Sequence, residues 1–275
     1  MKYEEVKDLG DEDWRRLTGV KRLTFDKIID ILKKAEAVKK IQGGKPNNLT
    51  MEDRLLMTLE YLREYRTYFH IAHSYGLSES ACYRNIRWIE DVLIKHPDFA
   101  LPGRKALLKS DAAYEVILID ATESPIERPK KKQKYFYSGK KKRHTLKTQV
   151  VVSRESREVI ATSFCNGKRH DFRLLKESQT HIHPYIKVLV DTGYQGIQKI
   201  HPNSQLPKKK TKKHPLSKED RQHNKKLAKN RVLNENVIGS LKRFKIIADR
   251  YRNRRKRFGL RFNLIAGIYN FELSY

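Results

Sequence analysis

The sequence predicts an α/β protein in which a mixed β-sheet domain follows an all-helical region. Up to about residue 96, apolar side chains recur at steps of three and four, which is the spacing of amphipathic helices. From Tyr114 onward, short apolar runs alternate with polar turns, as buried strands do, and helical spacing returns in the tail from Arg231. These two changes of period predict the order helices, strand, hairpin, short helix, strand, helix.

The charge balance predicts a polyanionic partner. Lys and Arg number 60 against 32 Asp and Glu, so the formal net charge is +28. Self-repulsion of this size is costly unless a polyanion binds, and nucleic acid is the expected one. A membrane surface is not expected, because no basic amphipathic anchor occurs and the longest apolar runs are far too short to span a bilayer.

The N-terminus and the cysteines predict a cytoplasmic protein. The first residues, MKYEEVKDLGDEDW, contain no apolar signal-peptide core. Cys82 and Cys165 lack the spacing of a metal site or a disulfide framework, as expected in a reducing compartment.

The helical region divides into two parts. Residues 1–48 are predicted as an auxiliary helical region, with a helix capped by Thr24. In residues 49–110, Thr50 begins a capping box, a short helix follows from about Thr67, and Ser78 can cap the next helix after a turn with glycine. This order is typical of a helix-turn-helix, although a plain three-helix packing unit explains it equally well. The positive charge favours DNA contact through the polar face of the last helix, which carries Ser80, Tyr83, Arg84 and Arg87.

Two apolar strands are each followed by an aspartate. Val116–Ile119 leads into Asp120, and Tyr185–Val190 leads into Asp191; a hairpin of Thr145–Ser153 and Val159–Phe164 lies between them. Either aspartate alone is commonly a turn-former. If the two strands are neighbours in one sheet, however, their carboxylates can share a hard divalent cation such as Mg²⁺.

The tail from Arg231 to Arg250 is predicted as a helix that adds a third carboxylate, Glu235. Taken alone it reads as a surface helix with an ion-paired outer face. Packed beside the sheet, Glu235 would complete a site for Mg²⁺ or Mn²⁺, two ions per active site, which suits phosphodiester chemistry. Its apolar stripe is Leu233, Val237, Leu241 and Phe244, and the opposite stripe is Arg231, Glu235, Gly239 and Lys242.

Lysine-rich segments flank these acids. Ten Lys or Arg occur between Arg128 and Lys147. Such runs are usually solvated surface, but beside a candidate phosphodiester site they favour contact with DNA phosphates. The cations expected to grip the backbone are Lys140, Lys141, Lys142, Arg143, Arg231 and Lys242.

Five further residues carry weaker expectations. Glu123 is expected to orient a neighbour or face the hairpin. His170 and Asp171 could lie near the site, but capping of a short helix is the favoured interpretation of Asp171. Gly193 and Gly196 are expected to allow a tight turn with positive φ and a close approach of the backbone after Asp191.

Three segments carry a resemblance to a known family. They are LIDATESPIERPKKKQKYFYSGKKKRHTLKTQ, VLVDTGYQG and RVLNENVIGSLKRFK. The sequence resembles a DDE transposase of the insertion-sequence type, in the IS-five family with Harbinger-like relatives, over nearly the whole chain. The resemblance implies an RNase H-like catalytic domain over residues 111–275, with Asp120, Asp191 and Glu235 as the metal-binding triad. It also implies a helix-turn-helix over residues 49–110 that recognises terminal inverted repeats.

The implied activity is prokaryotic, nucleoid-associated DNA transposition by a homodimer or larger assembly on double-stranded DNA. Two divalent ions would serve cleavage at the element ends, and the 3′-hydroxyls would then join target DNA. A family signature of Tyr, Arg, Glu and Lys is matched at Arg231, Glu235 and Lys242, but the tyrosine position holds Ala228. The alternatives are a catalytically silent DNA-binding protein or repressor, against which the intact triad argues, and an RNA-binding basic protein.

Overall fold

The computed structural model describes the chain except residues 1, 42, 44–45, 109–113 and 211–214. The chain forms two compact units, and each is assembled from segments far apart in the sequence. The first comprises Met1–Ala100, Leu241–Asp249 and Arg257–Tyr275, and the second Leu101–Ser240 and Arg250–Lys256. Across the described residues, no helix combines the length and apolar character that a membrane crossing requires.

The helices of the N-terminal half begin largely where their caps predict. The Thr50 hydroxyl accepts the Asp53 N–H at 3.1 Å, and Ser78 accepts the Ala81 N–H at 3.2 Å. The cap predicted at Thr24 is wrong, because its helix already begins at Arg22 and Thr24 is buried inside it. These helices are α1 (Tyr3–Val6), α2 (Asp11–Thr18), α3 (Arg22–Ile41), α4 (Met51–Arg63), α5 (Tyr68–Ser74) and α6 (Glu79–Leu93).

Helices α5 and α6 are joined by a tight turn in which Gly76 adopts a φ of +64°. A left-handed conformation there costs glycine little, since it has no Cβ. Helix α6 buries Cys82, Ile86 and Ile89 against the unit and exposes Arg84 and Arg87. The polar face predicted from the sequence is therefore the solvent-facing one.

The C-terminal helix α11 (Phe258–Leu273) belongs to this first unit through a buried ion cluster. Glu90 of α6 is fully buried, and it accepts from Arg257 Nε at 2.8 Å and from Arg261 Nε at 2.7 Å. The short α10 (Lys245–Ala248) and the 3₁₀ turn η1 (Pro97–Phe99) complete the unit.

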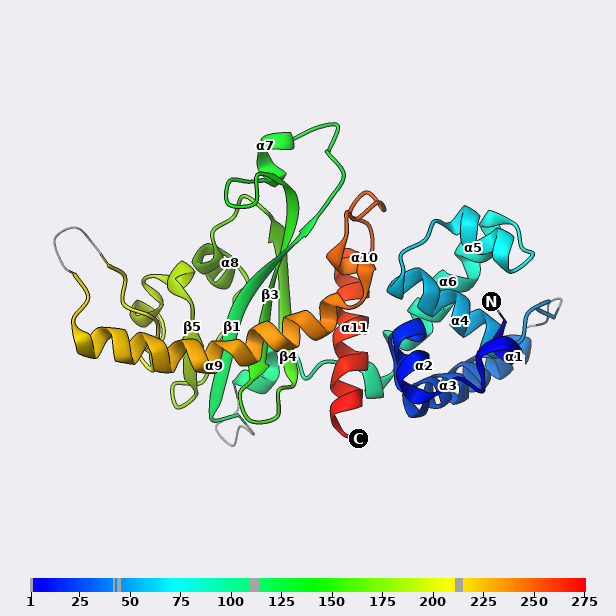
Figure 1. The fold of residues 1–275 in the computed structure, drawn as a ribbon, viewed down its shortest axis with the longest axis horizontal. Coiled ribbons are helices and arrows are strands. Elements are labelled where there is room, and N and C mark those ends of the chain that lie inside the picture. Colours follow the sequence, from blue (N-terminus) through cyan, green and yellow to red (C-terminus); the bar gives the residue numbers. More distant parts are fainter. Residues whose placement is uncertain (1, 42, 44–45, 109–113, 211–214) are drawn as a thin grey trace. The chain divides into compact units, whose positions relative to one another are not determined.

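The second unit is built on a mixed sheet with strand order β2-β3-β1-β5-β6, in which β4 also pairs with β3 (Figure 1). Strands β3 and β4 form the predicted hairpin, and β1 pairs antiparallel with β3 and parallel with β5. The strands are β1 (Val116–Pro125), β2 (Tyr137–Ser138), β3 (Arg143–Ser153), β4 (Val159–Asn166), β5 (Lys187–Val190) and β6 (Ser204–Gln205).

One face of this sheet carries the apolar core. Ile117, Ile119, Val188 and Val190 pack with Leu175 of helix α8. The remaining elements of the unit are α7 (Gln133–Phe136), α8 (Asp171–Glu177), η2 (Arg104–Leu107), η3 (Thr192–Tyr194), η4 (Ile197–Lys199) and the long α9 (Lys218–Lys242), whose last two residues belong to the first unit.

Two predicted boundaries are wrong. Strand β1 does not end at Asp120 but runs on to Pro125, because β3 continues to pair with it as far as Thr145. The tail helix begins earlier than Arg231 and stops at Lys242, since Phe244 leaves helical geometry and becomes the N-cap of α10.

Candidate active site

Asp120 and Asp191 lie at matching positions on neighbouring strands. The last parallel pair of β1 and β5 is Ile119 with Val190, so each aspartate is the next residue after that pair. Adjacent strands are about 4.8 Å apart, and side chains at one register position share a face of the sheet. Backbone hydrogen bonding therefore brings together the two acids that the sequence singled out.

The electrostatics of Asp120 show that other charged groups lie nearby. Burial raises the pKa of Asp120 to about 6, and the charges of Asp191 and Asp171 act in the same direction. The Ala121 N–H, which donates to Asp120 Oδ1 at 2.8 Å, and the Arg231 guanidinium lower the pKa of Asp120. The ionised form of Asp120 is thus destabilised by burial and by repulsion from the charges of Asp191 and Asp171.

Asp171 does not act as the helix cap that the sequence predicts. His170 occupies the N-cap of α8 without a side-chain hydrogen bond, while Asp171 Oδ1 accepts from Lys147 Nζ at 2.6 Å. Lys147 is buried and also donates to the Arg169 carbonyl at 2.6 Å and lies 3.8 Å from Glu123 Oε1. Lys147 is a site residue that the sequence does not indicate, and Asp171 takes the less favoured of its two predicted placements, near the site.

Gly193 allows the acids to crowd together. A Cβ at this position would lie 2.7 Å from Asp171 Oδ2 and 2.8 Å from Asp191 Oδ1, closer than carbon and oxygen tolerate. Its N–H donates to Asp191 Oδ1 at 2.7 Å. The predicted positive φ occurs at Gly196, at +94°, and not at Gly193. Gly193 is therefore needed for space rather than for an unusual backbone angle.

Tyr194 is buried within the influence of the three carboxylates and is hydrogen-bonded to Gln149. Burial, and then the charges of Asp171, Asp120 and Asp191, hold the pKa of Tyr194 well above its ordinary value. The phenol donates to Gln149 Oε1 at 3.4 Å, and the buried Gln149 Nε2 has no partner in the described part of the chain. No local sequence pattern marks these two residues.

Helix α9 crosses the sheet in Figure 1, and the charge of its Arg231 lowers the pKa of Asp120. Glu235, one turn later, is exposed, whereas the adjacent Asn234 is 2% exposed and both of its side-chain polar atoms lack partners among the described residues. The buried side of the helix is thus centred on Asn234, and Glu235 points away from that side.

The metal-binding set is only partly assembled. Among the described residues, no three His, Cys, Asp or Glu side chains are arranged to hold a metal ion. The chemistry of the site nevertheless suits a hard divalent cation. Asp120 and Asp191 are oxygen donors on one face, and a cation between them would relieve the repulsion that raises the pKa of Asp120.

Glu123 faces the hairpin, as expected. Its Oε2 accepts from the Thr145 hydroxyl at 2.8 Å, across the β1–β3 pair. It also shares Lys147 with Asp171, so it belongs to the ion network behind the aspartates.

The predicted DNA-contact cations lie on three elements. Arg84 and Arg87 are exposed on α6. Arg231 and Lys242 are half-buried on α9. The turn between β2 and β3 exposes Lys140, Lys141 and Lys142, and the first residue of β3, Arg143, is exposed beside them. Near that turn a cavity of about 710 Å³ is lined by Arg128, Gln133, Lys134, Tyr137, Gly139, His144 and Lys168.

The comparisons with known proteins identify the family of the chain. A family model described as DDE superfamily endonuclease matches residues 119–270, which include Asp120, Asp191 and Glu235. The chain belongs to the DDE superfamily of endonucleases. A second model, described as the helix-turn-helix of the same superfamily, matches residues 47–99 and favours that assignment over a plain three-helix unit.

Two curated relatives of this DDE endonuclease are named as transposases. One, for insertion sequence element IS702 of Microchaete diplosiphon, is 48% identical over 274 residues, covering 100% of this chain and 99% of the relative. The other, for insertion sequence element IS112 of Streptomyces albus G, is 27% identical over 238 residues and covers 84% of each chain. No solved structure matches the chain. The family predicted from the sequence is confirmed, and the chain is a transposase of the insertion-sequence type.

Proposed function

We propose that this transposase binds the terminal inverted repeats of its own element, cleaves the DNA there and joins the freed 3′-hydroxyls to target DNA. The observation that carries the proposal is that Asp120 and Asp191 each follow directly on the last parallel pair of β1 and β5, with the charges of Asp191, Asp171 and Arg231 all acting on Asp120. An acid pair on one sheet face, with a cation beside it, suits an anionic phosphodiester substrate.

Asp120 and Asp191 would hold divalent ions, and Glu235 of α9 would complete the set as the third acid. Two Mg²⁺ or Mn²⁺ ions would supply a lowered pKa for the attacking water or 3′-hydroxyl and stabilisation of the leaving oxygen. Gly193 leaves room for the acids, and its N–H orients Asp191. Arg231 would offset the negative charge that gathers on the phosphate as the bond breaks.

The division of labour follows the same proposal. Residues 49–110 would bind the repeats through Arg84 and Arg87 of α6, with residues 1–48 as an auxiliary region. Residues 111–275 would supply the RNase H-like catalytic domain, in keeping with its central antiparallel and parallel strand pairs, while Leu241–Asp249 and Arg257–Tyr275 of this range pack in the first unit. Its cations Lys140, Lys141, Lys142, Arg143 and Lys242 would grip backbone phosphates. Joining two element ends requires both to be held together, so a homodimer or larger assembly on DNA is part of the proposal.

The test is cleavage of a labelled duplex that carries the inverted repeats flanking this gene. Native protein with Mg²⁺ should nick at a defined position, and EDTA or Glu235→Gln should abolish the nicks while leaving binding intact. Glu219→Gln is the matched control, because it removes an exposed acid from the first turn of the same helix.

Two results would contradict the proposal. Cleavage that survives in Asp191→Ala would remove the triad assignment. Binding without cleavage in either Mg²⁺ or Mn²⁺ would instead support a silent DNA-binding protein or repressor.

A further inference from the structure

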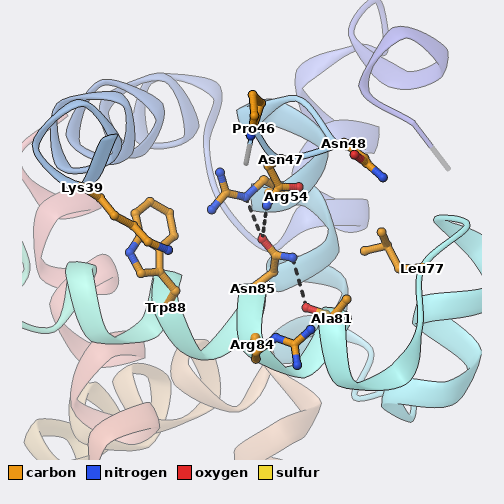
Figure 2. Close-up of a pocket in the computed structure, with 10 residues that line it drawn as sticks. All are labelled: Lys39, Pro46, Asn47, Asn48, Arg54, Leu77, Ala81, Arg84, Asn85 and Trp88. Atoms are coloured by element: carbon orange, nitrogen blue, oxygen red, sulfur yellow. Dashed lines mark hydrogen bonds between the residues drawn. The ribbon is translucent and has the colours of Figure 1, made fainter. Parts of the chain in front are cut away.

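A polar cavity of about 320 Å³ opens beside the first half of α6 (Figure 2). It lies wholly within the first unit, between α6, the end of α3, α4 and the segment that precedes α4. The residues that matter for its chemistry are Lys39, Asn48, Arg54, Arg84, Asn85 and Trp88. None of them belongs to the site around Asp120.

The floor of the cavity is a closed network. Arg54 is 3% exposed; its Nε donates to Asn85 Oδ1 at 2.8 Å, and its guanidinium pairs with Glu36. Asn85 Oδ1 also accepts from Asn47, and its Nδ2 donates to the Ala81 carbonyl at 3.0 Å, as the dashed lines in Figure 2 show. The charge of Arg54 is therefore already balanced, and the network fixes the shape of the cavity.

The rim, in contrast, offers donors that nothing in the described chain uses. Arg84 and Asn48 are exposed, and neither side chain makes a hydrogen bond or ion pair with another described residue. Lys39 is exposed too, and its recorded contact is with the Trp88 ring, 5.6 Å from the centroid. Lys and Arg side chains are donor-only cations, so the rim is built to receive an anion.

The Trp88 ring is not a free stacking surface. The Arg54 guanidinium lies 4.6 Å from its centroid, and Lys39 also lies over the ring. Cation–π contacts of this kind occupy the ring that a nucleobase would need for stacking. The cavity therefore favours a compact oxyanion over a flipped-out base.

We propose that this cavity binds one backbone phosphate of duplex DNA, with Arg84 and Lys39 supplying charge and the Asn48 amide a further hydrogen bond. The inference rests on the proposed DNA binding by α6, and it assigns the Arg84 side of that helix to positioning. Phosphate contacts set the register of a recognition helix, whereas base contacts read sequence. Arg87, which donates to the Tyr83 hydroxyl at 3.1 Å, lies outside the cavity.

The salt dependence of binding tests this directly. The full chain is titrated with a labelled duplex over a series of NaCl concentrations, and the slope of log K against log salt is compared between native protein and Lys39→Gln/Arg84→Gln. The magnitude of this slope increases by about 0.9 for each phosphate that the protein neutralises. If Lys39 and Arg84 bind one phosphate, their loss should lower the magnitude of the slope by about 0.9. If they bind separate phosphates, their loss would lower it by about 1.8, and this result would overturn the proposal.

A matched control and a modified DNA sharpen the result. Lys34→Gln/Lys95→Gln removes two exposed cations that do not line the cavity and should leave the slope near native. In a scan of duplexes with one neutral methylphosphonate each, one position should weaken native binding and have no effect on Lys39→Gln/Arg84→Gln. If instead that variant changes the preferred base at one position with an unaltered slope, the cavity reads sequence and the proposal is wrong.

The outcome is separable from that of the proposed function. Slope and methylphosphonate effects are measured on any duplex that binds. A failure to prefer the terminal repeats would contradict the proposed function and leave the phosphate assignment intact.

Discussion

Asp120→Asn should stabilise the second unit while it abolishes DNA cleavage. The pKa of Asp120 is about 6 in the folded chain against an ordinary 3.8, mainly because of burial and the nearby charges of Asp191 and Asp171. A difference of about two pKa units at about 1.36 kcal/mol each corresponds to about 3 kcal/mol. Ionisation of Asp120 therefore lowers the free energy of unfolding by this amount, and an asparagine at this position, which does not ionise, avoids the loss.

The sign of the pH dependence follows from the raised pKa. At about pH 3 the carboxyl is protonated in both the folded and the unfolded state, so native protein and variant should be equally stable. As the pH rises from about 4 to about 6 the folded chain still holds a proton that the unfolded chain has released, so the native protein loses stability, and above pH 6 the loss is constant. The gain from Asp120→Asn should therefore grow from near zero at about pH 3 to about 3 kcal/mol at about pH 8.

Amide hydrogen exchange of Ile117–Ile119 is the suitable assay, because it reports the opening of β1 rather than of the whole chain. Native protein, Asp120→Asn and the exposed-site control Glu155→Gln are compared in EDTA at several pH values. A gain that is the same at about pH 3 and about pH 8, or no gain at about pH 8, would refute the electrostatic reasoning.

Three further outcomes are expected. Gly193→Ala should fold normally but lower DNA cleavage by roughly a hundredfold, because its Cβ displaces the carboxylates of Asp171 and Asp191; native-level cleavage would contradict that crowding. Lys147→Met should lower the free energy of unfolding in urea by about 3–5 kcal/mol by leaving Asp171 unpaired, and adding Asp171→Asn should recover much of this loss. Gly267→Ala should cost about 3 kcal/mol or more in thermal unfolding, since its Cβ would lie 2.0 Å from a carbonyl oxygen of η1; an unchanged melting temperature would rule out this close packing.

The parts of the fold set by local chemistry could be predicted from the sequence. Thr50 and Ser78 cap their helices because a hydroxyl satisfies an N–H two or three residues away, and this requires no distant partner. The β3–β4 hairpin is likewise local. The proximity of Asp120 and Asp191 could be predicted with one added assumption, that the strands before them are neighbours. The structure confirms this assumption, because β1 and β5 pair in parallel.

Features that depend on distant partners could not be predicted. Asp171 has the sequence context of a helix cap, but a lysine on β3 competes for its carboxylate and the buried ion pair prevails. The placement of α11 with the N-terminal helices rests on Glu90 and two arginines more than 160 residues later, and no local pattern links them. In both cases a buried charge is paired with an opposite charge that is distant in the sequence.

Glu235 shows why the position of a site residue is harder to predict on a helix than on a strand. Strand register is fixed by backbone hydrogen bonds, so the positions after Ile119 and Val190 must face the same side whatever their side chains are. The orientation of a helix about its axis is set only by which side chains it buries, and successive residues differ by about 100°. On α9 the buried set includes Asn234 with its amide unpaired, an arrangement that costs about 1–3 kcal/mol rather than stabilising the helix. Burial of Val237 and Leu241 therefore favours the helix orientation that exposes Glu235, whereas burial of the unpaired Asn234 amide disfavours it. The spacing of apolar residues in the sequence does not show which of these two contributions is larger.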